Sequence, residues 1–185
     1  MNKKKLITLF FSVLLVMPSV ACSQSGDARE VADKLAKASV RTIYNSLRKE
    51  GIPWEIIRDK HMPKMLSRSL RSIRRDYSSD IIMNDFLPTL IRSYYSEVDK
   101  INRENSFTCV EDTFIVRTIV PFIQECKIQL GPWNISVSRV VDMVLNISYP
   151  YQVCRGECPS RVQSSFASAF NYDFSVSRFS RICAN

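Results

Sequence analysis

The feature that most constrains this chain is an apolar segment near its start, from Leu6 to Met17. The segment has twelve residues without a charge, follows the lysines at positions 3–5, and is closed by Pro18. A membrane-spanning helix needs about 20 apolar residues, whereas a short apolar core behind a positively charged start is typical of a secretory signal peptide. We therefore expect residues 1–21 to be removed and the rest of the chain to fold in a bacterial cell envelope, facing the periplasm, with secretion as the alternative.

The residue after the predicted cleavage point, Cys22, is a candidate for lipidation. Ser19, Val20 and Ala21 precede it and fit a permissive bacterial lipobox, although the leucine that most often stands three positions before the cysteine is missing. Residues 22–27 are polar and suit a flexible tether from a lipid anchor. A lipid anchor would attach an otherwise water-exposed domain to a membrane. Ordinary cleavage after Ala21, which leaves Cys22 unmodified, is the alternative.

The cysteine count bears on the same choice. The chain has six cysteines, and exported proteins usually pair their thiols as disulfides. Lipidation of Cys22 would leave five thiols and so at least one without a partner. The disulfide candidates are Cys109, Cys126, Cys154, Cys158 and Cys183. Local spacing suggests Cys109 with Cys126 and Cys154 with Cys158, which leaves Cys183 free or paired with Cys22.

Length and charge restrict the class of protein. Removal of residues 1–21 from the 185-residue chain leaves 164 residues, enough for one domain with a hydrophobic core. The formal charge falls from +8 to +5 when the three signal-peptide lysines are lost. A charge of this size does not indicate a dedicated nucleic-acid binder, and we expect no nucleic-acid partner.

The mature chain is expected to be all-α, a disulfide-stapled irregular bundle of about six or seven helices over residues 28–185. Glycine occurs only four times, which disfavours a sandwich or barrel with many tight turns. We find no internal repeat in the sequence. Apolar spacing, prolines and turn residues predict helical segments at 27–50, 54–60, 63–77, 79–98, 110–130, 136–147, 160–170 and 173–183. We expect Gly51 to end the first segment, Pro88 to kink its segment or begin a new one, and Pro121 to kink its own. The residues of the 136–147 segment that we expect to be buried are Val137, Val140, Val141, Val144 and Leu145.

The helix predicted over residues 63–77 carries the clearest candidate binding surface. Its cations recur at intervals of four, three and four residues and share one stripe of the helix, which we call the basic ridge: Lys64, Arg68, Arg71 and Arg75. Apolar residues lie on the opposite side: Leu66, Leu70, Ile73 and Tyr77. Arg58, Lys60 and Arg74 could extend the ridge. Such a helix can dock on a bundle and present cations to an anionic envelope component or an acidic protein patch, although charge runs are more often simply solvated helix faces.

No catalytic, metal or cofactor signature is present. Cys154 and Cys158 are four residues apart, which is not the C-x-x-C spacing of a thiol oxidoreductase, and no histidine pair suits zinc. His61 is the only histidine, and no sequence element pairs it with a nucleophile. Glu111 and Glu157 are the carboxylates that a glycan hydrolase could use as a general acid. We expect no metal and no small-molecule cofactor.

Taken together, these features lead us to expect a non-enzymatic binding or assembly factor for an envelope or secretion-system component. Export, cysteine content and the basic ridge support this expectation. A small secreted hydrolase of cell-wall glycan, or a secreted toxin or inhibitor, are the alternatives.

Overall fold

The computed structural model describes residues 25–105, 113–126, 139–140, 142–144, 146–147, 164 and 167–170. This part of the chain is predominantly helical and contains no strand, which confirms the all-α prediction. The first helix, α2, spans Ser25–Lys49 and begins two residues before the predicted start, so Asp27 lies in its first turn. Gly51 follows the helix with φ at +77°, a left-handed conformation that glycine adopts without strain, as predicted for this end.

Two long helical segments follow α2, and each contains a π-helical turn. The first comprises α3 (Trp54–Ile56), η1 (Ile57–His61) and α4 (Met62–Ile73). The second comprises α5 (Ser79–Ile81), η2 (Ile82–Phe86) and α6 (Leu87–Glu104). A third segment has η3 (Ile115–Ile119) followed by α7 (Val120–Glu125).

Proline stands at the same place in all three segments. Pro63, Pro88 and Pro121 are each the second residue of the α-helix that follows the π-helical turn. The residue before each proline donates its N–H to the carbonyl five residues back, at the start of the π-helical turn. Proline lacks an N–H, and its ring clashes with the carbonyl four residues back in a regular helix. The wider turn makes room for the ring, so the helix continues through the proline.

This arrangement corrects one expectation. Residues 54–60 and 63–77 were predicted as separate helices, but Trp54–Ile73 is continuous, since the residues between its parts all keep helical backbone angles. The first two segments also repeat one local structure: Trp54, Ile57 and Pro63 correspond to Ser79, Ile82 and Pro88, each 25 residues later.

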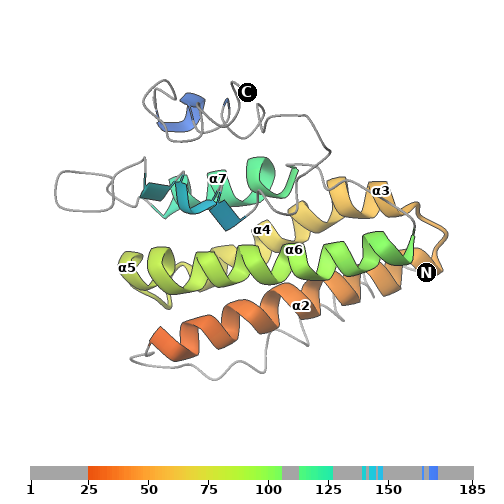
Figure 1. The fold of residues 1–185 in the computed structure, drawn as a ribbon, viewed down its shortest axis with the longest axis horizontal. Coiled ribbons are helices and arrows are strands. Elements are labelled where there is room, and N and C mark those ends of the chain that lie inside the picture. The colour runs from red at the N-terminus through yellow and green to blue at the C-terminus, as the bar shows by residue number, and fades with distance from the viewer. Residues whose placement is uncertain are drawn as a thin grey trace.

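The helices form parallel pairs (Figure 1). Arg29 of α2 pairs with Asp85 of η2, and Arg41 of α2 pairs with Glu97 of α6, so residue numbers rise together along α2 and along the segment that contains η2 and α6. The segment of α3, η1 and α4 runs in the opposite direction, and η3 with α7 runs alongside it, as shown by Thr118 beside Pro63 and Arg74 beside Glu125.

Aromatic contacts hold these pairs together. The Tyr94 ring stacks on Phe114 with the ring centroids 3.6 Å apart, which joins α6 to the residue that precedes η3. The Trp54 indole donates to Asn102 Oδ1 at 2.6 Å and meets the Tyr44 ring edge-on. All three segments therefore contribute to one core with α2.

The later helices are described only in part. The described residues of the predicted 136–147 helix are helical, and Val140 and Val144 are buried as predicted. Residues 164 and 167–170 are helical, in agreement with the predicted helix at 160–170. The predicted helix at 173–183 lies outside the described residues, as do the signal peptide, Cys22, Cys109, Cys154, Cys158 and Cys183.

Candidate binding surface

The exposed face of α4 carries most of the basic ridge. Lys64, Arg68 and Arg71 are exposed, and the opposite side of the helix is buried at Leu66, Leu70 and Ile73. This two-sided distribution follows from residue spacing, because positions three and four apart lie on the same side of a helix.

The last member of the ridge is not in the helix. The sequence predicted that the helix would continue to Tyr77, but α4 ends at Ile73 and Arg75 lies in the turn that follows. The Arg75 N–H donates to the Ser72 carbonyl at 3.2 Å, so the turn still continues the path of the helix. The Arg75 side chain is exposed.

The ridge cations differ in their partners. Arg71 Nε lies 3.8 Å from Glu125 Oε2, and both side chains are exposed. Arg74 donates to the Glu125 backbone carbonyl at 2.6 Å, so these two arginines tie α4 to the end of α7. Lys64, Arg68 and Arg75, in contrast, make no hydrogen bond or ion pair with any residue that the structure describes.

Of the residues predicted to extend the ridge, Arg58 does not belong to it. Arg58 is 6% exposed, and its guanidinium donates to both carboxylate oxygens of Asp59, at 2.6 and 2.8 Å. It therefore neutralises its neighbour at the edge of the core. Lys60 is exposed, as expected of a ridge residue.

The structure adds one cation that sequence reasoning missed. Arg117, on η3, is exposed and donates to the Asp59 carbonyl at 3.5 Å. Ser67 of α4 donates to the Arg117 carbonyl at 3.4 Å, which holds η3 against the ridge helix. Only the packing of η3 beside η1 and α4 reveals this neighbour, since Arg117 is far from the ridge in sequence.

The pKa of the single histidine, His61, depends on the charges around it. Burial, followed by the positive charges of Lys60 and Lys64, holds the pKa of His61 below its ordinary value, while Glu50 acts weakly in the other direction. His61 follows Lys60 directly in η1 and is half-buried. It has no carboxylate or nucleophile as a described hydrogen-bond partner, so the structure gives it no catalytic arrangement.

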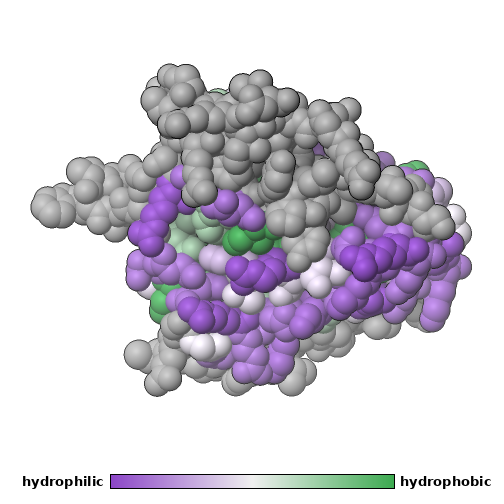
Figure 2. Space-filling model, viewed as in Figure 1, coloured by the Kyte–Doolittle hydropathy of each residue, from purple (hydrophilic) through white to green (hydrophobic). Residues whose placement is uncertain are grey.

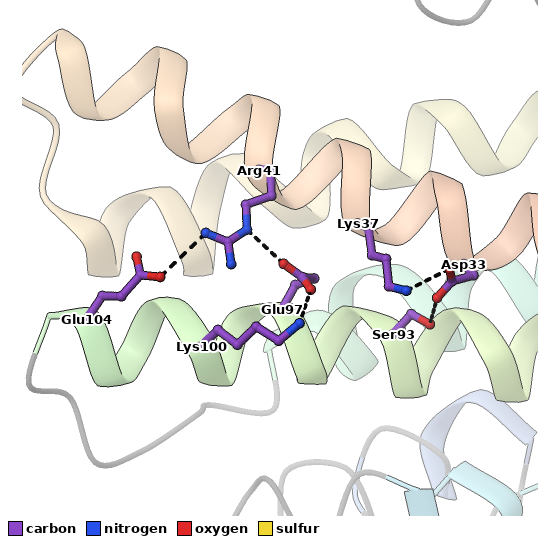
Figure 3. A network of polar contacts seen from close by, with 7 residues as sticks. All are labelled: Asp33, Lys37, Arg41, Ser93, Glu97, Lys100 and Glu104. Carbon is purple, nitrogen blue, oxygen red and sulfur yellow. Dashed lines mark hydrogen bonds and ion pairs between the residues drawn. The ribbon is translucent and has the colours of Figure 1, made fainter.

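A second group of charges lies between α2 and α6, and we call it the α2–α6 seam (Figure 3). Its residues are Asp33, Lys37, Arg41, Ser93, Glu97, Lys100 and Glu104. Glu97 accepts from Arg41 at 2.8 Å and from Lys100 at 2.6 Å. The bonds from both cations hold the pKa of Glu97 below its ordinary value, although its burial acts in the opposite direction.

The same seam holds a second carboxylate. Asp33 accepts from Lys37 at 2.8 Å and from the Ser93 hydroxyl at 2.6 Å, and these two hydrogen bonds lower its pKa. The face that α2 and α6 share is largely hydrophilic (Figure 2). The charges of the seam pair with one another, and this pairing joins α2 to α6.

The glycan-hydrolase alternative needs a carboxyl group with a raised pKa. Asp33 and Glu97, the described carboxyl groups with a resolved shift, have lowered values. Glu111 and Glu157, the candidates for that role, lie outside the described residues. The described part of the chain thus offers no support for this alternative.

The predicted disulfide between Cys109 and Cys126 is not formed. Cys126 is a free thiol at the end of α7, and burial raises its pKa to about 11. Cys126 is half-buried against the hydrophobic core, so it behaves as a small apolar residue there. The other predicted pairings involve cysteines outside the described residues.

Within the described helices, none combines the length and the apolar character needed to cross a membrane. No group of three or more His, Cys, Asp or Glu side chains is placed to hold a metal ion in the described ranges. The chain matches no protein-family model, and no curated protein or solved structure is significantly similar to it.

Proposed function

We propose that this chain is an exported bacterial envelope protein, not an enzyme, that binds another envelope or secretion-system component. One observation carries the proposal: three of the four ridge cations, Lys64, Arg68 and Arg75, are exposed and lack a carboxylate partner among the described residues, whereas the opposite side of α4 is buried. Uncompensated surface cations favour binding of an anionic partner, and they contribute little to stability by themselves.

The signal peptide supports the export part of this proposal. A lipid on Cys22 would hold the domain at a membrane facing the periplasm, and the chain outside the described residues would keep Cys109, Cys154, Cys158 and Cys183 for pairing. Intact mass of the mature protein, before and after reduction and alkylation, tests both points. A mass that starts at Cys22 and includes acyl chains supports the anchor, and an unmodified chain refutes it.

Site-specific photo-crosslinking in the native host tests the binding surface. A photoreactive residue at Ser72, which is exposed beside the ridge, should give a discrete adduct with one envelope component. The same residue at Asn45, exposed on α2, should not give that adduct. The Ser72 adduct should disappear in the R68E/R71E/R75E variant.

A matched control separates local charge from total charge. Lys34, Arg92 and Arg103 are exposed on α2 and α6. The K34E/R92E/R103E variant changes the net charge by the same amount and should keep the Ser72 adduct. An adduct that survives in the ridge variant, or that is lost equally in both variants, would refute the ridge as the binding surface.

A further inference from the structure

Four cations from three elements form a cluster that extends beyond the basic ridge. Lys60 comes from η1, Lys64 and Arg68 from α4, and Arg117 from η3, and all four side chains are exposed. We call them the cationic cluster. The Arg117 guanidinium and the Ser67 hydroxyl each bond across to the facing segment, so η3 holds Arg117 at the side of the ridge helix.

The cluster lacks internal neutralisation in the described part of the chain. Lys60, Lys64 and Arg68 make no ion pair there, and the bond from Arg117 goes to a neutral backbone carbonyl. The nearest carboxylate along η1, Asp59, is already bonded twice by the buried Arg58. His61 lies between Lys60 and Lys64 in the sequence, and its lowered pKa reflects their charges in addition to its own burial.

An apolar side chain lies next to this charge. Ile56 is 45% exposed, unlike the other large hydrophobic residues that the structure describes. Ile56, Lys60, Lys64 and Arg68 follow one another at intervals of four, so they lie along the same side of the helical segment. This surface offers one apolar side chain followed by a row of cations. It is therefore complementary to an amphipathic helix whose carboxylates recur at intervals of four.

The distance between the cationic cluster and Cys22 favours a protein partner over the membrane that would hold a lipid anchor. Ser25, where α2 begins, is three residues after Cys22, a separation of at most about 11 Å. The 25 residues of α2 extend for about 37 Å. Trp54 packs on Tyr44, near the far end of α2, so α3, which contains Ile56, lies at the end of the bundle opposite the first turn of α2 (Figure 1). A lipid on Cys22 would hold the near end at the membrane and leave Ile56 directed away from it.

We infer that Ile56 and the cationic cluster form the contact surface for an acidic amphipathic helix of a protein partner. This inference rests on the proposed function and deepens it, because it names the class of partner and adds Ile56, Lys60 and Arg117 to the surface. Exposed ion pairs are individually weak and screened by salt, so the affinity for such a helix should fall steeply as salt rises.

Binding of defined probes to the purified mature protein tests the inference. The first probe is a fluorescent helical peptide with glutamates at intervals of four and an adjacent row of leucines. The second is a polyglutamate peptide of equal charge, and the third is a vesicle of phosphatidylglycerol and phosphatidylcholine. Fluorescence anisotropy and vesicle co-sedimentation give the affinities, and circular dichroism checks that each variant is folded.

The wild type should bind the amphipathic peptide more tightly than polyglutamate or the vesicles. The K60E/K64E/R117E variant should lose at least about tenfold in affinity, since three favourable contacts become repulsive. The K34E/R92E/R103E control should stay within about twofold. Ile56→Ser should weaken binding of the amphipathic peptide several-fold and leave polyglutamate binding unchanged, because only the former offers an apolar row.

Three results would overturn the inference. Equal losses in the two charge-reversal variants would show non-specific attraction, and tighter binding to the vesicles through the same residues would identify an anionic lipid surface instead. The third result separates this inference from the proposed function. If R68E/R71E/R75E abolishes the Ser72 crosslink in the native host and K60E/K64E/R117E does not, the proposed function stands and the cationic cluster is not its surface.

Discussion

The α2–α6 seam and the basic ridge are both rows of charged residues on helices, yet the structure uses them differently. In the seam, the cations Arg41 and Lys100 meet the carboxylate of Glu97, whose side chain is only 7% exposed. On the ridge, Lys64 and Arg68 face solvent without a described carboxylate. A row of charges that pairs with opposite charges on a neighbouring helix stabilises the fold. A row without such pairs remains available to bind a partner.

The difference is not visible in the rows themselves. Asp33, Lys37 and Arg41 on α2 are spaced by four residues, as regularly as Lys64 and Arg68 on α4. What separates the two rows is the helix that packs beside each. Residues of α6, more than 50 positions later in the chain, provide Ser93 and Glu97 for the seam.

The largest expected effect lies in the seam. Glu97→Ala should lower the free energy of unfolding by about 1–2 kcal/mol, because it removes two charge-assisted hydrogen bonds whose cationic partners are partly solvated. Glu104→Ala is the control, since Glu104 is 52% exposed and lies 3.5 Å from Arg41, so its loss should cost less than about 0.5 kcal/mol. Urea denaturation measures both, and equal effects would remove the distinction between the two carboxylates.

Acid should weaken the seam next. The folded pKa values of Asp33 and Glu97 lie below the ordinary values of 3.8 and 4.5. Their contribution to stability is therefore present above about pH 4.5 and is lost as the pH falls through the lowered values. The Glu97→Gln variant should show a flatter fall in stability below pH 4.5 than the wild type. An unchanged pH dependence would mean that Glu97 does not titrate with a lowered pKa.

The smallest stability effect belongs to the ridge. Lys64 and Arg68 are like charges four residues apart on an exposed helix face, and such pairs are mildly destabilising. Arg68→Gln should therefore leave the unfolding free energy unchanged or raise it by about 0.2–0.5 kcal/mol. Urea denaturation at low and high salt provides the measurement. A loss above about 1 kcal/mol would show that Arg68 has a structural partner.

The regular helices and their buried faces could be predicted from sequence. Gly51 correctly marked the end of α2, and apolar spacing correctly gave Leu66, Leu70 and Ile73 as the buried side of α4. Val140 and Val144 were likewise expected to be buried and are. These features depend on local periodicity and turn chemistry, which a single sequence displays directly.

Continuity through Pro63 could not be predicted by the same rules, whereas the segment at 110–130 was expected to be a helix kinked at Pro121. Pro63 at a helix start is the common arrangement, and it led to the prediction of two helices where the structure has one. The π-helical turn that accommodates the proline has no simple sequence signature. Its threefold occurrence, with isoleucine six residues before each proline, becomes recognisable only once the turns are known.

The composition of the charged surfaces depended on tertiary contacts. Arg58 has the residue type of a ridge extension, but the packing of η1 turns it toward Asp59. Arg117 joins the cationic cluster because η3 packs beside η1 and α4. Cys126 was predicted to form a disulfide from its spacing to Cys109, and the structure places it as a free, half-buried thiol.

The most direct test of the unmatched charge is the titration of His61, the only histidine in the chain, which gives a single imidazole signal by NMR. Burial, followed by the positive charges of Lys60 and Lys64, holds the pKa of His61 below its ordinary value, so the K60Q/K64Q variant, which removes only the charges, should have a higher His61 pKa than the wild type. The K34Q/R92Q variant, altered on α2 and α6, should titrate like the wild type. An equal or lower pKa in K60Q/K64Q would mean that these charges are neutralised within the molecule, and it would contradict the account of the ridge as an open cationic surface.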